Sequence, residues 1–182
     1  MSNLIIIPAR LESTRLPNKP LADIDGTPMI IHVLNRGLES ACGDVVVATS
    51  NKEIQDIVES YGARAIMTNP NHPSGSDRIY EALNIFDNDL KYKNIVNLQG
   101  DLPTIDPNLI KLTFKLIEDN QEADISTLGG KIKDRAELED LNVVKAYVKN
   151  NDKPLYADDF IRSPKGYDPK KLYHHLGIYG YK

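Results

Sequence analysis

Residues 4–10 read Leu-Ile-Ile-Ile-Pro-Ala-Arg, and this short stretch decides the fold. Four consecutive apolar residues, three of them β-branched, are typical of a strand that is buried on both faces. A proline and an arginine then end the apolar run. Strands of this kind belong to parallel sheets that helices cover on each side. The sequence therefore predicts an α/β protein whose first strand leads directly into a polar loop.

Short apolar runs alternate with amphipathic stretches along the rest of the chain. The apolar runs predict further strands at residues 45–48, 65–67, 95–98, 123–128, 143–148 and 176–179. Helical spacing of apolar residues predicts helices at residues 28–38, 51–61, 76–85, 107–118 and 134–138. Residues 150–171 are polar, contain prolines and receive no assignment. This alternation indicates right-handed crossovers and a mostly parallel sheet with helices on both faces.

Composition bounds the kind of protein. A length of 182 residues with 41% hydrophobic residues suits one domain with a substantial core, or one domain plus an appendage. The net charge of -4 argues against a general nucleic-acid binder, which is usually basic. The single cysteine cannot form an intramolecular disulfide, which fits a reducing compartment. We find no targeting segment and no apolar run near the ~20 residues that span a bilayer, so we expect a cytoplasmic protein without membrane partners.

The loop after the first strand concentrates positive charge. Arg10, Arg15 and Lys19 lie within ten residues of one another. Such cations repel each other unless an anion is bound, and guanidinium and ammonium groups suit phosphate oxygens. The alternative is a solvated loop whose cations face water. The glycine patterns of P-loops and of dinucleotide-binding proteins are both absent.

Ligands of open α/β sheets bind outside the carboxyl ends of the strands. Three loops meet that condition most clearly, at residues 8–20, 68–78 and 99–104. In the last of these, Asp101 follows a strand and a glycine. A lone carboxylate there suits Mg²⁺, which takes one or two carboxylates together with phosphate oxygens and water. The alternative is a turn aspartate before a proline.

Four motifs carry a resemblance to a known family, in matching order and spacing. They occupy residues 7–21 (Ile-Pro-Ala-Arg-Leu-Glu-Ser-Thr-Arg-Leu-Pro-Asn-Lys-Pro-Leu), 72–78 (His-Pro-Ser-Gly-Ser-Asp-Arg), 97–101 (Asn-Leu-Gln-Gly-Asp) and 175–181 (His-Leu-Gly-Ile-Tyr-Gly-Tyr). Together they resemble the CMP-sugar-acid synthetases, and most closely those that activate 3-deoxy-manno-octulosonate (Kdo). The first motif is shared with sialate-activating relatives, and the last is more specific to the Kdo enzymes.

The resemblance implies a CTP site. In it the backbone of Ala9 and the side chains of Arg10, Arg15 and Lys19 would hold the nucleotide, and Ser74, Gly75 and Arg78 would border cytosine and ribose. A serine-glycine turn lets a flat base approach the backbone closely. The same residues also read as the N-cap of a helix, and both interpretations can hold together.

The resemblance also implies a metal and a sugar site. Asp101 would hold Mg²⁺, and Gln99 would face the sugar acid. Arg162 would clamp the sugar carboxylate, and His175 with Tyr179 or Tyr181 would contact Kdo. From the residues alone, a histidine and a tyrosine on a strand are more often packing residues. The three other histidines have no metal-binding spacing and read as structural or solvated (His32, His72 and His174).

The activity implied is Mg²⁺-dependent transfer of CMP from CTP to Kdo for lipopolysaccharide biosynthesis, with Arg10, Lys19 and Asp101 as the catalytic residues. The alternatives are a cytidylyltransferase for a related sugar acid and a weakly active or inactive remnant that still binds nucleotide. CTP and Kdo would be its small-molecule partners.

Two departures from the family pattern modify these expectations. About three residues (157–159) are inserted before residues 160–164, which displaces Arg162. The family also continues beyond residue 182, with helices that complete the sugar pocket and build the dimer, and with a second metal-binding carboxylate. A homodimer of the family type is therefore expected only if it forms without its usual surface. The expectation is a Rossmann-like nucleotidyltransferase fold with its C-terminal part missing. It would form a single domain, with a nucleotide-binding half at residues 1–120 and an incomplete sugar-binding half at 121–182.

Overall fold

The computed structural model describes residues 2–12, 17–150 and 155–182. The chain forms two compact units. The first comprises Met1–Ser126 and Ile178–Lys182, and the second comprises Thr127–Gly177. The expectation of a single domain divided near residue 120 stays a prediction.

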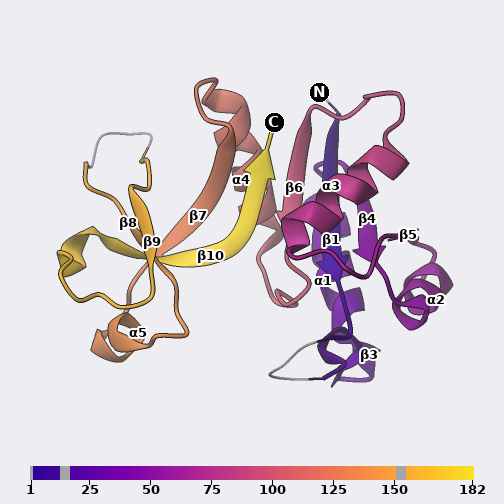
Figure 1. Ribbon diagram of the computed structural model, residues 1–182, viewed down its shortest axis with the longest axis horizontal. Helices are drawn as coiled ribbons and strands as arrows, with labels where there is room; N and C mark the ends of the chain where they lie inside the picture. Colours follow the sequence, from indigo (N-terminus) through magenta and orange to yellow (C-terminus); the bar gives the residue numbers. More distant parts are fainter. Residues whose placement is uncertain (1, 13–16, 151–154) are drawn as a thin grey trace. The chain divides into compact units, whose positions relative to one another are not determined.

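Among the residues that the structure describes, the first unit contains one part of an eight-stranded sheet. In this part, β1 (Asn3–Ala9) pairs in parallel with β4 (Asp44–Thr49) on one side and with β6 (Asn94–Leu98) on the other. Beyond β4 lies β5 (Arg64–Met67), also parallel. The last residues of β10 (Leu172–Tyr181) pair antiparallel with β6, as Figure 1 shows. The mostly parallel sheet predicted from the sequence is confirmed.

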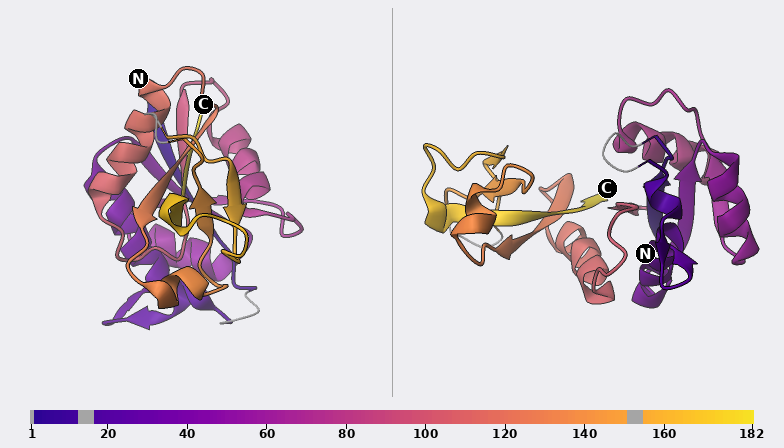
Figure 2. Two further views of the ribbon diagram at one scale, coloured as in Figure 1. Left: turned by 90° about the vertical axis from the view of Figure 1, so that its left-hand side faces the viewer. Right: turned by 90° about the horizontal axis from the view of Figure 1, so that it is seen from below.

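Helices cover both faces of this sheet. They are α1 (Met29–Ser40), α2 (Lys52–Ser60), α3 (Gly75–Phe86) and α4 (Pro107–Asp119). On one face, Ile79 of α3 packs in a core cluster with Leu4 and Ile6 of β1. Figure 2 shows α1 and α4 on the other side of the strands, where Gly37 of α1 approaches Val45 so closely that an added Cβ would lie 3.1 Å from it. The four residues of the opening apolar run are 0% exposed, as their sequence predicts.

The first unit contains two short strands that were not predicted from the sequence. β2 (Asp23–Ile24) and β3 (Thr27–Pro28) form an antiparallel hairpin. Its turn residues Asp25 and Gly26 both have positive φ, at 52° and 77°. Aspartate and glycine adopt this backbone readily, and it matches the twist of a tight hairpin. Strands of two residues are too short to show an alternating pattern. The 3₁₀ turn η1 (Lys19–Leu21) precedes this hairpin.

The second unit contains most of β7 (Ile125–Lys131), α5 (Arg135–Glu139), β8 (Lys145–Tyr147), β9 (Asp159–Ile161), the 3₁₀ turn η2 (Pro169–Lys171) and the first residues of β10. Here β10 pairs antiparallel with β8, and β8 with β9. β10 begins at Leu172, four residues before the predicted strand at 176–179. Its early residues mix polar and apolar side chains, so no apolar run marks the start.

A buried lysine joins two loops of the second unit. Lys145 is 0% exposed, and its Nζ donates to the backbone carbonyls of Asp140 and, at 2.8 Å, of Arg162. Carbonyl acceptors of this kind offset the cost of removing an ammonium group from water. Lys145 therefore ties the backbone of Arg162, directly after β9, to that of Asp140.

Across residues 2–12, 17–150 and 155–182, no helix is long and apolar enough to cross a membrane.

Candidate functional site

Loops converge at the carboxyl edge of the parallel strands in the first unit. Pro8, at the end of β1, lies beside two of them. A Cβ added to Gly100, which follows β6, would lie 2.8 Å from the carbonyl oxygen of Pro8. A Cβ added to Gly75, at the start of α3, would lie 3.7 Å from Pro8 Cγ. The three predicted loops therefore meet at this edge, as the rule for open α/β sheets requires.

Two of the predicted catalytic residues are in direct contact there. Lys19 begins η1, and Asp101 lies in the turn after β6. Their Nζ and Oδ2 atoms are 2.9 Å apart, and their side chains are 36% and 46% exposed. The turn that carries Asp101 is closed by a hydrogen bond from the amide of Leu102 to the carbonyl of Gln99, at 3.2 Å. A half-exposed ion pair of opposite charges thus lies at the edge of the sheet.

Two arginines and one glutamate add charge to the same edge. Ala9 is the buried last residue of β1, and Arg10 after it is exposed. Arg78 of α3 is only 3% exposed, and burial followed by repulsion from Arg10 lowers the pKa of its guanidinium. The backbone hydrogen bond of Glu12 and one from Asn51 lower the pKa of the Glu12 carboxyl, which the charges of Arg78 and Arg10 lower further. Arginines stay protonated at neutral pH, so this group suits an anion.

A fourth loop, absent from the sequence predictions, joins the edge through Asn51, two residues after β4. Its Oδ1 accepts from the amide of Leu11 at 3.1 Å, and its Nδ2 donates to Glu12 Oε1 at 3.4 Å. Asn51 therefore holds the described part of the cationic loop. The carboxyl-end rule applies to β4 as it does to β1, so the position of Asn51 was a usable signal. Arg15 lies outside the described residues.

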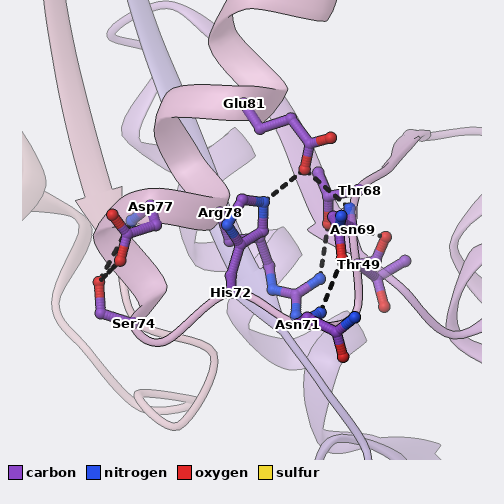
Figure 3. A network of polar contacts seen from close by, with 9 residues as sticks. All are labelled: Thr49, Thr68, Asn69, Asn71, His72, Ser74, Asp77, Arg78 and Glu81. Carbon is purple, nitrogen blue, oxygen red and sulfur yellow. Dashed lines mark hydrogen bonds and ion pairs between the residues drawn. The ribbon is translucent and has the colours of Figure 1, made fainter.

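The start of α3 is capped by its own side chains. Ser74 Oγ accepts from the amide of Asp77 at 3.2 Å and donates to Asp77 Oδ2 at 2.5 Å, as Figure 3 shows. The N-cap interpretation of this serine is confirmed. Nearby, Arg78 Nη1 donates to Thr68 Oγ1 at 2.6 Å. The contact of Ser74, Gly75 and Arg78 with a nucleotide stays a prediction.

Tyr179 of β10 lies opposite Asn97 of β6 in the antiparallel register. Ile95, two residues before Asn97, packs in the core cluster beneath α3. Because side chains alternate between the faces of a strand, Asn97 and its partner Tyr179 lie on the face of the sheet that α3 covers. Asn97 is 3% exposed, and its Oδ1 has no hydrogen-bond partner in the described part of the chain. Burial raises the pKa of Tyr179, which keeps its hydroxyl neutral. This face therefore offers an amide oxygen and a phenol near the end of β6.

Gln99, predicted to face the sugar acid, lies in the turn after β6 in the first unit, whereas Arg162 and His175 belong to the second unit. Arg162 is exposed, and its Nη1 donates to the carbonyls of Leu141 at 3.0 Å and Asn142 at 3.3 Å. His175 Nε2 lies 2.9 Å from Thr127 Oγ1, and burial lowers the pKa of the ring. His175 is therefore neutral at physiological pH, and part of the Arg162 guanidinium is engaged by backbone. Their roles toward a sugar stay predictions.

Two histidines predicted to be structural or solvated make side-chain contacts with glutamates. His72 Nε2 lies 2.5 Å from Glu81 Oε2 in the first unit. In the second unit, His174 Nδ1 contacts Glu137. Neither pairing could be read from the sequence, because the partners are nine and 37 residues apart.

The arrangement of carboxylates decides which ligands the protein could give to the predicted cation. Within the described residues, no group of three or more histidines, cysteines, aspartates or glutamates converges. A divalent cation at Asp101 would take this carboxylate, with phosphate oxygens and water among its other ligands. This donor set fits Mg²⁺, which keeps several waters and is commonly bound through substrate phosphates.

Comparisons with known proteins agree with this architecture. The family model for "Cytidylyltransferase" matches residues 4–182. The 3-deoxy-manno-octulosonate cytidylyltransferase of Methylorubrum extorquens (strain PA1) is 48% identical over 182 residues, covering 98% of this chain and 72% of the relative. The enzyme of that name from Brucella anthropi is 48% identical over 185 residues, covering 100% of this chain and 74% of the relative.

A solved structure agrees as well. The structure of CMP:2-keto-3-deoxy-manno-octonic acid synthetase complexed with CTP matches with a TM-score of 0.88 at 37% identity, covering 100% of this chain and 74% of that one. The chain thus spans about three quarters of the length of these relatives. The predicted nucleotidyltransferase fold is confirmed. The chain belongs to the cytidylyltransferase family, among the 3-deoxy-manno-octulosonate cytidylyltransferases, or CMP-Kdo synthetases.

Proposed function

We propose that this chain transfers CMP from CTP to Kdo, with release of diphosphate. The anomeric hydroxyl oxygen of Kdo forms a bond to the α-phosphorus and loses its proton to solvent, while the bond from the α-phosphorus to the bridging oxygen of the diphosphate breaks. The observation that carries this proposal is the meeting of Arg10, Lys19 and Asp101 at one edge of the sheet, in a chain 48% identical to enzymes named for this activity.

Arg10 and Lys19 act on the triphosphate. Their charges neutralise phosphate oxygens and stabilise the negative charge that builds on the leaving diphosphate. Arg15 of the same loop is proposed to assist. Lys19 reaches the triphosphate by exchanging its partner Asp101 for phosphate oxygens. That exchange costs little, because an exposed ion pair contributes only about 0–1 kcal/mol.

Asp101 is proposed to hold Mg²⁺ together with the phosphates of CTP. When bound, the ion would supply charge neutralisation at the phosphate and lower the cost of ionising the sugar hydroxyl. Asp101 itself is well placed for this role, because its turn is fixed by the Gln99–Leu102 hydrogen bond and its side chain is half exposed. Release of Lys19 leaves the carboxylate free to bind the cation.

The two ends of the substrate pair are assigned to different residues. Ser74, Gly75 and Arg78, with the backbone of Ala9, are proposed to bind the cytidine end. The sugar acid is proposed to contact Gln99, Arg162, His175 and Tyr179. The imidazole of His175 and the phenol of Tyr179 are uncharged and polar, which suits contact with sugar hydroxyls. The other guanidinium donors of Arg162 suit a carboxylate. The enzyme would act in the cytoplasm, and its product would serve lipopolysaccharide biosynthesis.

Diphosphate release tests the proposal. The chain is incubated with CTP and Mg²⁺, and with Kdo, sialic acid or a sugar phosphate as acceptor. We expect release with Kdo and at least tenfold slower release with the other acceptors. Faster release with another acceptor would show that this acceptor, and not Kdo, is the substrate. CTP binding without turnover on any acceptor would instead support a chain that binds nucleotide but does not catalyse transfer.

A further inference from the structure

Glu81 of α3 closes the loop that precedes this helix. One of its oxygens, Oε2, accepts from the backbone amide of Asn69 at 2.7 Å and contacts His72 Nε2 at 2.5 Å. Figure 3 shows Glu81 above the loop with both contacts. Because carboxylates accept hydrogen bonds, the His72 nitrogen carries the proton in this contact. A single side chain thus joins two loop positions that are three residues apart.

The same helix also holds both ends of the loop. At one end, Arg78 donates to Thr68 Oγ1 at 2.6 Å, and the amide of Thr68 donates to the carbonyl of Thr49 in β4 at 2.8 Å. At the other end, Ser74 is bonded to Asp77. The start, the middle and the end of the loop are therefore tied to the first turns of α3.

Charge strengthens the central contact. The hydrogen bond from His72, followed by the one from the Asn69 amide, lowers the pKa of the Glu81 carboxyl, which is therefore ionised at neutral pH. The side chains of His72 and Glu81 are 20% and 34% exposed. Hydrogen bonds to an ionised carboxylate are roughly twice as strong as neutral ones, and partial exclusion of water limits their screening.

The loop runs directly into the Ser74–Gly75 turn, which lies against the strand that carries the cationic loop. Gly75 is close enough to Pro8 that an added Cβ would be in van der Waals contact with its ring. A displacement of residues 69–72 would therefore move the turn relative to the end of β1. A contact with a purely structural role would affect only the stability of the fold. The contacts of Glu81, in contrast, hold a loop that ends at the turn proposed to meet the nucleoside.

We propose that Glu81 is a positioning residue for nucleotide binding, which holds the loop of residues 69–74 so that the Ser74–Gly75 turn meets the cytidine end of CTP. This inference rests on the proposed function for the role of the turn. Loss of Glu81 displaces the turn but leaves Lys19 and Asp101 in place. CTP affinity and the preference for CTP over UTP then fall, while turnover at saturating CTP changes little.

Calorimetric titration with CTP and with UTP, together with steady-state rates, tests this role. Three variants are compared with the wild type. Glu81→Ala removes the contacts with Asn69 and His72. Glu81→Gln replaces the carboxylate with an amide of similar shape, which retains one acceptor oxygen. Glu39→Ala is the matched control, because Glu39 forms a 2.7 Å ion pair with Arg36 on α1, a contact that involves none of the residues proposed to bind substrate.

For Glu81→Ala we expect about tenfold weaker CTP binding and a KM for CTP raised by the same factor, with kcat within about twofold. Glu81→Gln should recover most of the affinity, and Glu39→Ala should bind as the wild type does. Thermal unfolding of each variant shows whether it is folded at the assay temperature. If Glu81→Ala does not fold, His72→Phe removes one donor and retains an aromatic ring, and about threefold weaker binding is expected.

A folded Glu81→Ala variant that binds CTP and UTP as the wild type does would overturn the inference, even if its Tm is lower. If only His72→Phe folds, wild-type affinity of that variant for CTP overturns the inference as well. These results leave the proposed transfer reaction intact. Conversely, a wild type that binds CTP without turnover removes the transfer reaction but not the role of Glu81. A wild type that binds no CTP removes both.

Discussion

The Nζ of Lys19 lies 2.9 Å from Oδ2 of Asp101, although 82 residues separate them in the sequence. The pair joins the loop after β1 to the loop after β6. Because both side chains are more than a third exposed, the pair contributes at most about 1 kcal/mol and opens readily. The pair brings together the ammonium group proposed to bind phosphate and the carboxylate proposed to bind the metal ion.

Asp101→Asn removes the negative charge while keeping the size of the side chain. We expect kcat/KM for diphosphate release to fall about 100-fold, and the Mg²⁺ concentration for half-maximal rate to rise, because a neutral amide is a poor ligand for a hard cation. Rates measured over a series of Mg²⁺ concentrations test this. A wild-type rate and an unchanged Mg²⁺ dependence would remove Asp101 from the metal site.

Lys19→Met removes the charge and keeps the length of the side chain. The expected result is a fall in kcat/KM for CTP of about 10- to 100-fold, because a charge on the leaving diphosphate is no longer neutralised. The free energy of unfolding should change by less than about 1 kcal/mol, since the lost ion pair is exposed. Urea unfolding and steady-state kinetics measure the two effects. A large loss of stability with normal kinetics would assign Lys19 a structural role instead.

Gly100→Ala tests the close approach of two loops. The added Cβ would lie 2.8 Å from the backbone oxygen of Pro8, so one of the two loops must shift. We expect a loss of about 1–3 kcal/mol in the free energy of unfolding and a lower kcat/KM, because Asp101 is the next residue. Gly130→Ala is the control, since nothing lies within 4 Å of a Cβ there. Equal stability of the two variants would contradict the close packing.

Acid should weaken the contact between Glu81 and its partners. In the folded chain the pKa of the Glu81 carboxyl is below its ordinary value of 4.5, so the folded state binds this proton less readily than the unfolded state. The stabilisation is therefore present above about pH 4.5 and is lost as the pH falls through the lowered pKa. Wild type should be more stable than Glu81→Gln at about pH 7, with a smaller difference at about pH 3. A difference independent of pH in urea unfolding would count against an ionised Glu81.

Lys145→Met removes a buried ammonium group from the second unit. The carbonyls of Asp140 and Arg162 would lose their donor in a region that water reaches poorly. We expect a loss of about 2–3 kcal/mol in the free energy of unfolding. Lys165→Met is a control for the change of side chain, because Lys165 is exposed. Chemical denaturation of both variants measures the difference, and equal midpoints would show that the carbonyls find other donors.

Most of the fold could be predicted from local patterns. The apolar run of β1 gave a buried parallel strand, and helical spacing placed α1 and α3 within two residues of their observed ends. The hairpin of β2 and β3 and the start of β10 could not be predicted, because strands so short or so mixed in polarity carry no periodic signal.

The sequence by itself determined the class of sheet, the cationic loop after β1, the carboxylate after β6 and the resemblance that named the family. These follow from the order of residues along a strand or helix, which the local backbone period makes visible. Only the tertiary structure decided that Lys19 pairs with Asp101, that Arg78 is buried and that Glu81 holds the loop through His72 and Asn69. Strand pairing and helix packing bring side chains from distant segments together, and a local pattern contains no record of those neighbours.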